Sequence, residues 1–197
     1  MSWIVTKSGR EIEFENLENS DIVLEDLLHA TSQINRFTGH TSRPYSVLAH
    51  SIGCGYYAQQ RNWSDEAQLA CMFHDLHEGL IGDISTPVKL MITGVTVFER
   101  TVESHVHNVF GLRRIMQSNA GFVKEADIAL LLYERNHLIG HPKRLWAMDD
   151  RPPTVPIAPL IFGTSGEQIA HFYHMLFSLD ESVIPQQTKD FISNVYD

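Results

Sequence analysis

A short stretch near the middle of the chain combines side chains that bind metals with side chains that transfer protons. The decapeptide HDLHEGLIGD begins at His74 and is followed directly by ISTPVK, which ends at Lys89. Its imidazoles and its carboxylates, at Asp75, Glu78 and Asp83, can serve as ligands for a divalent cation or as acid–base groups. This stretch is therefore the first candidate for a catalytic centre.

The apolar residues around this stretch predict an α-helix from Ser64 to Gly82, because they recur at steps of four, three and four positions. They are Leu69, Phe73, Leu76 and Leu80. On that helix His74, Asp75 and Glu78 lie within about 100° of one another, away from the apolar stripe. An imidazole and two carboxylates are costly to bury unless they are paired or bind a cation. A solvated acidic face is the alternative, but the predicted helix lacks the Lys and Arg residues that such a face usually carries.

A metal site needs ligands from more than one element of the fold. His50 lies in an apolar helical pattern from about Ser46 to Gln60, and Asp127 lies in another from Lys124 to Leu138. A buried carboxylate that caps a helix is the alternative interpretation of Asp127. Two neutral imidazoles and two carboxylates favour one divalent transition metal, Co²⁺, Mn²⁺, Zn²⁺ or Fe²⁺, over Mg²⁺.

The composition predicts a single globular domain that spans residues 1–197. Hydrophobic residues make up 43% of the 197 residues and charged residues 20%, both ordinary for a globular protein. The net charge of −9 argues against a nucleic-acid polymer as partner. No apolar run has the length of a membrane span, and no signal peptide follows Met1, so we expect no membrane partner and a cytoplasmic location. Cys54 and Cys71 fit buried free thiols in such a compartment.

The pattern along the chain predicts an all-α fold, a helical bundle with a short N-terminal β-hairpin. The hairpin covers residues 1–15, where apolar residues alternate around the turn KSGR: Trp3, Val5, Ile12 and Phe14. Residues 20–138 form the helical core with the metal site, and residues 160–197 form the C-terminal helices. Helices are expected to open at Ser20, to run from Thr96 to Gly111, to start at the capping box of Thr164 and Glu167, and to end at Tyr196.

The order H…HD…D, with the doublet on a helix, resembles the HD-domain phosphohydrolase superfamily. The resemblance spans roughly Leu28 to Glu134. Its most specific parts are the blocks INRF, which begins at Ile34, and HDxxExxxGDxxxPVK, which begins at His74. These blocks look like those of the bacterial 5′-deoxynucleotidases and the phage deoxynucleotide phosphohydrolases. The fold expected from the resemblance is the HD-domain helical bundle.

The resemblance also implies roles for individual residues. The metal ligands would be His50, His74, Asp75 and Asp127. Glu78 matches the family's catalytic glutamate and Asp83 its second acidic residue; either could orient the attacking water while the other protonates the leaving oxygen. His77 is expected to be a hydrogen-bonded group of the core rather than a ligand.

Four further residues match substrate-binding positions: Arg36 for the 5′-phosphate, Phe37 for base stacking, and Arg43 and Lys89 for the phosphates. Each has a simpler alternative. The arginines could pair with surface carboxylates, Phe37 could belong to the core, and Lys89 could be solvated.

The resulting expectation is an enzyme that hydrolyses phosphate from 2′-deoxynucleotides, as dNMP or dNTP, and so controls the nucleotide pool. The series dATP, dADP and dAMP is the leading candidate, the enzyme would be a homo-oligomer, and it would work in a bacterial or phage-infected cytoplasm. One alternative is an alarmone hydrolase, whose doublet continues HDxxED, whereas Glu78 precedes Gly79 here. Another is a binuclear HD oxygenase; this is disfavoured because His105 and His107, two residues apart on a helix, cannot both face one site.

Overall fold

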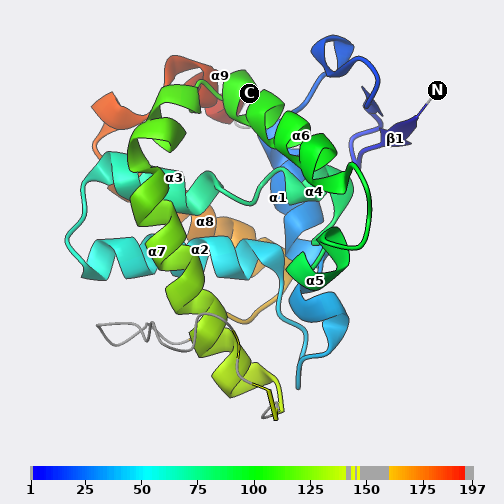
Figure 1. The fold of residues 1–197 in the computed structure, drawn as a ribbon. Helices are drawn as coiled ribbons and strands as arrows, with labels where there is room; N and C mark the ends of the chain where they lie inside the picture. Colours follow the sequence, from blue (N-terminus) through cyan, green and yellow to red (C-terminus); the bar gives the residue numbers. More distant parts are fainter. Residues whose placement is uncertain (1, 141–142, 145, 147–159, 194–197) are drawn as a thin grey trace.

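Helices form most of the described chain, and a small hairpin precedes them (Figure 1). The computed structural model describes residues 2–140, 143–144, 146 and 160–193. The predicted helical fold with an N-terminal β-hairpin is confirmed. None of the helices in these ranges combines the length and the apolar content needed to cross a lipid bilayer.

The hairpin consists of the antiparallel strands β1 (Trp3–Val5) and β2 (Glu11–Glu13). Ile4 pairs with Ile12, and Ile12 is fully buried. Trp3 and Val5 are exposed, so the inward face differs from the alternation noted in the sequence. The fold places the inward isoleucines against the helical core.

The helices are α1 (Leu24–Gln33), α2 (Val47–Gln60), α3 (Asp65–Phe73), α4 (Glu78–Ile81), α5 (Thr86–Lys89), α6 (Val95–Val109), α7 (Arg113–Leu138), α8 (Ser165–Ser178) and α9 (Gln186–Ser193). Short 3₁₀ turns cover Leu17–Asn19, Arg36–Gly39 and Glu181–Val183. The capping box of Thr164 and Glu167 is present at the start of α8 as predicted.

Three helices, α2, α3 and α7, pack on one another and form the part of the core that carries the candidate site (Figure 1). Helix α1 packs against α2, α4 and α8. Helix α2 approaches its neighbours closely because it contains Gly55, where an added Cβ would lie 2.7 Å from the side chain of Met72 in α3. The close packing fixes the position of His50 on α2 relative to α3 and α7.

Several helix boundaries differ from the sequence prediction. The helix expected to open at Ser20 begins at Leu24, and α7 begins already at Arg113 rather than at Lys124. The last helix is described only to Ser193, so the predicted end at Tyr196 lies outside the described residues.

The continuous helix predicted from Ser64 to Gly82 is wrong in one respect, because α3 ends at Phe73 and α4 begins only at Glu78. In the turn between them the backbone bonds run three residues back, as from the Glu78 amide to the Asp75 carbonyl at 3.0 Å. Such bonds tighten the chain relative to an α-helix. The doublet of His74 and Asp75 therefore stands at the carboxyl end of a helix, not within one.

Candidate metal centre

Four side chains from three parts of the fold converge on one point. His50 comes from α2, His74 and Asp75 from the turn after α3, and Asp127 from α7. The Nε2 atom of His50 lies 3.5 Å from Oδ1 of Asp127 and 3.7 Å from Oδ2 of Asp75. The Nε2 atom of His74 lies 3.1 Å from the same Asp75 oxygen. We call these four residues the primary ligand group.

Both imidazoles of the group are held by their other ring nitrogen. The Nδ1 atom of His50 lies 2.7 Å from Oε1 of Glu134, and Nδ1 of His74 lies 2.8 Å from the carbonyl oxygen of Cys71. When Nδ1–H donates to these acceptors, the lone pair of Nε2 faces the group, as in histidines that bind metals. The Nε2 atom of His74 is buried without a hydrogen-bond partner. This donor set fits a divalent transition cation.

The carboxylates of the group are ionised. Burial raises the pKa of Asp127, but its hydrogen bond with His50 and the charge of that imidazole lower the pKa well below the usual value. Asp75 follows the same rule, because burial raises its pKa and His74 lowers it further. The carboxylates are thus stabilised by protonated imidazoles, and a bound cation would take the place of those protons, because a metal ligand must be the neutral imidazole.

Glu134 completes the support of this site, and sequence reasoning missed it. Its side chain is fully buried in α7 and accepts hydrogen bonds from His50 and, at 3.0 Å, from Nε of Arg36. Burial raises the pKa of Glu134, but the charges of Arg36 and His50 lower it below the usual value. One signal was available: Glu134 follows Asp127 by two helical turns, so both lie on one face of the helix.

The two acidic residues expected to handle protons, Glu78 and Asp83, both feel the charge of Asp75. Glu78 is buried, and its Oε2 atom has no hydrogen-bond partner. Burial and the charges of Asp75 and Asp83 raise the pKa of Glu78 to about 10. Burial and the charge of Asp75 also raise the pKa of Asp83, while Arg36 opposes this shift. A cation bound at Asp75 would lower both pKa values through its charge.

The four residues expected to bind substrate fall into two pairs. Arg36 is buried between Glu134 and Asp75, 3.7 Å from the Asp75 carboxylate, so the structure gives it a role inside the protein. The amino group of Lys89 donates a hydrogen bond to Glu99 of α6.

Phe37 and Arg43 both contact aromatic rings, and the Phe37 ring also lies 5.6 Å from the guanidinium carbon of Arg36. Phe37 has a positive φ of 56° and its ring lies 6.5 Å from that of Trp146. The exposed Arg43 guanidinium lies over the ring of Phe162, 3.2 Å from its centre. The structure thus brings Arg36 and Lys89 toward acidic residues, keeps Phe37 next to Arg36 and places Arg43 on an aromatic ring. The contacts of these four residues with a substrate stay predictions.

A cavity of about 400 Å³ opens onto the primary ligand group between α6 and α7. Its lining includes three of the four ligands, two cations and an apolar wall, namely His74, Asp75, Asp127, Arg113, Lys124, Met116, Ala120 and Val123. The volume is that of small-molecule sites. The ligand group therefore borders a space that can admit a substrate.

His107 also lines this cavity, which the sequence did not reveal. Its side chain is buried, and its Nε2 atom has no hydrogen-bond partner. Burial, with the charges of His77 and His74, lowers the pKa of His107 to about 4. His107 therefore borders the same cavity as the ligands His74, Asp75 and Asp127.

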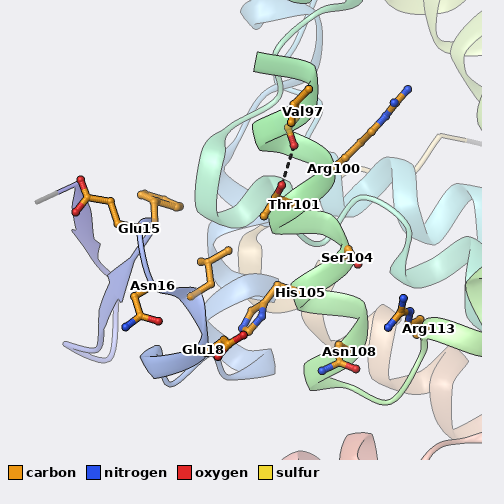
Figure 2. A pocket seen from close by; sticks show the side chains of 12 residues that line it. Glu15, Asn16, Glu18, Val97, Arg100, Thr101, Ser104, His105, Asn108 and Arg113 are labelled. Atoms are coloured by element: carbon orange, nitrogen blue, oxygen red, sulfur yellow. Dashed lines mark hydrogen bonds between the residues drawn. The ribbon is translucent and has the colours of Figure 1, made fainter. Parts of the chain in front are cut away.

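A larger hollow of about 720 Å³ lies on another side of α6, against the segment that follows the hairpin (Figure 2). His105 and Glu18 both line this hollow, His105 from α6 and Glu18 from the segment after the hairpin (Figure 2). His105 and His107 therefore line different spaces, as their spacing predicts. The smaller cavity is the candidate substrate site because only it includes the primary ligands.

The fold and the site together define a helical protein with a buried candidate metal centre beside a small-molecule cavity. No family model matches the sequence. The chain is 30% identical over 165 residues to the uncharacterized protein YfdR of Escherichia coli strain K12, a match that covers 81% of this chain and 88% of YfdR. It is 28% identical over 145 residues to an uncharacterized protein of Rhodobacter capsulatus, covering 71% of this chain and 74% of that protein. The chain belongs to the family of YfdR.

Proposed function

We propose that this protein is a metal-dependent phosphohydrolase of the HD type that removes phosphate from 2′-deoxynucleotides. The observation that carries the proposal is the convergence of His50, His74, Asp75 and Asp127, with both imidazoles fixed by acceptors on their far nitrogen. These four residues would hold one divalent transition metal. When bound, that cation would polarise a phosphoryl oxygen and lower the pKa of water.

The chain's own residues supply the remaining parts of the chemistry. Glu78 and Asp83 both feel the charge of Asp75, so one can orient a water molecule and the other can give a proton to the leaving oxygen. Arg36 holds Glu134 and Asp75 in place. Phosphoryl transfer depends mostly on such positioning and on neutralising charge.

The cavity between α6 and α7 is the proposed substrate site. Arg113 and Lys124 are the cations of its wall, and they can pair with phosphate oxygens. Met116, Ala120 and Val123 can face the apolar parts of a nucleoside. Lys89, which donates a hydrogen bond to Glu99, is a further cation that would meet the phosphates when it leaves Glu99.

The resemblance of the block HDxxExxxGDxxxPVK supports the finer parts of the proposal. The substrate would be a dNMP or dNTP, with dATP, dADP and dAMP as leading candidates. The enzyme would be a homo-oligomer and would control the nucleotide pool in a bacterial or phage-infected cell. An alarmone hydrolase is the competing proposal that the same experiment separates.

The test is release of phosphate or tripolyphosphate from a panel of dNMPs, dNTPs, NMPs and ppGpp, in Co²⁺ or Mn²⁺ and with EDTA as control. We expect release from deoxynucleotides that EDTA abolishes. Release from ppGpp alone would favour the alarmone hydrolase. If no compound of the panel is hydrolysed, the phosphohydrolase proposal fails.

A further inference from the structure

A second group of potential ligands lies next to Asp75 and is not used as a ligand set by the proposed function. His77, Glu78 and Glu99 each offer one ligand atom, and these atoms lie within 4.8 Å of one another. His77 and Glu78 are buried at the start of α4, and Glu99 reaches them from α6 with a side chain that is 12% exposed. With Lys89, which binds Glu99, we call these residues the α4–α6 cluster.

Two atoms of the cluster are buried without a partner, which points to a ligand. The Nδ1 atom of His77 lies 3.1 Å from the carbonyl oxygen of His74, so a proton on Nδ1 is used in that bond. The Nε2 atom is then left with a lone pair, 3.9 Å from Oε1 of Glu99 and beyond hydrogen-bonding distance. Oε2 of Glu78 is likewise buried and unpartnered. Buried polar atoms are normally satisfied, so both exceptions need an explanation.

The arrangement repeats that of the primary ligand group. His74 also directs Nδ1 to the carbonyl oxygen three residues earlier, at Cys71, and leaves Nε2 buried without a hydrogen bond. A carboxylate lies near Nε2 in both places, Asp75 for His74 and Glu99 for His77. The turn between α3 and α4 therefore presents two imidazoles in the same way, one to each group.

We propose that His77, Glu78 and Glu99 form a second divalent-cation site beside the primary ligand group. One neutral imidazole and two carboxylates are a ligand set for Zn²⁺, Mn²⁺ or Co²⁺. Two neighbouring cations are a common arrangement in enzymes that cleave phosphate esters. The site concerns cation binding alone, so it does not depend on the identity of any substrate.

Lys89 pairs with Glu99 in this structure, so it would compete with a cation for the Glu99 carboxylate. Its amino group donates to Glu99, and its side chain extends from the short helix α5 with 21% of its surface exposed. A lysine that reaches a carboxylate from a four-residue helix can withdraw into solvent. Binding of the cation is thus expected to release Lys89.

The first experiment counts cations. The full chain is freed of metal with a chelator, dialysed against saturating Co²⁺, and analysed for cobalt per chain without substrate. We expect two Co²⁺ per chain in the wild type and one in both Glu99→Gln and His77→Gln. Glu66→Gln, whose carboxylate pairs with Arg114 away from both groups, is the control and should keep two.

Either of two results would overturn the proposal: one Co²⁺ per chain in the wild type at saturation, or two in both Glu99→Gln and His77→Gln. The side chain of Glu99 is less buried than that of His77, so its variant is the safer of the two for folding. Thermal unfolding of each variant checks this. Because no nucleotide is present, the result is independent of the phosphate-release panel.

A second measurement uses the competition with Lys89. In Lys89→Met the ammonium group is gone, and Co²⁺ should bind the α4–α6 cluster roughly tenfold more tightly, as read by isothermal titration. If the ion pair between Lys89 and Glu99 has only a structural role, the affinity for Co²⁺ should not increase. An unchanged or weaker affinity would remove Glu99 from the proposed ligands.

Discussion

The primary ligand group and the α4–α6 cluster are neighbours, but the fold supports them differently. Two members of the first, His50 and Asp127, stand on α2 and α7, helices of 14 and 26 residues, and the fully buried Glu134 backs His50. The second depends on α4 and α5, of four residues each, and on the first turns of α6. Ligands on long packed helices are held more precisely than ligands on short ones.

The side chains beside the two groups also differ in their exposure to solvent. Next to the α4–α6 cluster, Leu90 and Met91 are 80% and 85% exposed. Around His50 the side chains are buried, and Gly55 lets α2 approach its neighbours closely. The comparison indicates a rigid part, the primary ligand group, that could hold one cation, and a more adaptable part, the α4–α6 cluster, that could change its partners.

Loss of Asp75 should have the largest effect, because it lies near both imidazoles of the primary ligand group and near Arg36. We expect Asp75→Ala to abolish phosphate release and to lower the cobalt content by one ion per chain. Glu66→Gln in α3, whose carboxylate pairs with Arg114, is the control. Full activity in Asp75→Ala would show that the rigid part is not the catalytic centre.

The next largest effect is expected from Glu78, which lies between the two groups. Removal of an acid–base group lowers turnover by about 10²–10⁴-fold. Glu78→Ala should show such a loss while the primary cation is retained, as measured by cobalt content and by phosphate release. Undiminished turnover would remove Glu78 from the proton-handling residues.

The rigid part can be weakened through its support. Glu134→Gln leaves the buried Arg36 without its carboxylate, which should cost about 3–5 kcal/mol in the free energy of unfolding. It should also weaken Co²⁺ binding about 10–100-fold. Glu125→Gln on the same helix removes a partly exposed partner of Arg61 and should cost less than about 1 kcal/mol. If urea unfolding shows that the two variants lose the same free energy of unfolding, the rigid part does not depend on Glu134 as proposed.

The smallest effect is expected from Asp26 of α1, the helix on which α4 packs. Burial raises the pKa of Asp26, but hydrogen bonds from Ser8 and Thr6 lower it further, below the usual value. Its contribution to stability is therefore complete above the unfolded-state pKa and is lost as the pH falls through the folded-state pKa.

Asp26→Asn should cost about 1–3 kcal/mol at pH 7. The difference from the wild type should shrink in acid, when urea unfolding is followed from pH 7 to pH 3. A difference that stays constant over this range would show that the charge of Asp26 does not stabilise the hairpin on α1.

Local patterns predicted much of the fold because they report local physics. The capping box at Thr164 needs only residues three apart, and the apolar stripes of α2, α6 and α7 follow the helical period. The turn between α3 and α4 was missed for the same reason. Its tightened backbone bonds leave the apolar spacing unchanged, so Leu76 and Leu80 still match a continuous helix.

The sequence by itself determined which residues could form a site: the doublet His74 and Asp75, with His50 and Asp127 on other helices. Residue type and spacing suffice for this, because imidazoles and carboxylates in apolar helices are costly without a partner. Only the tertiary structure decided that Glu134, 84 positions from His50, fixes its imidazole, and that His107 borders the same cavity. These pairings depend on how distant helices pack, which no local pattern records.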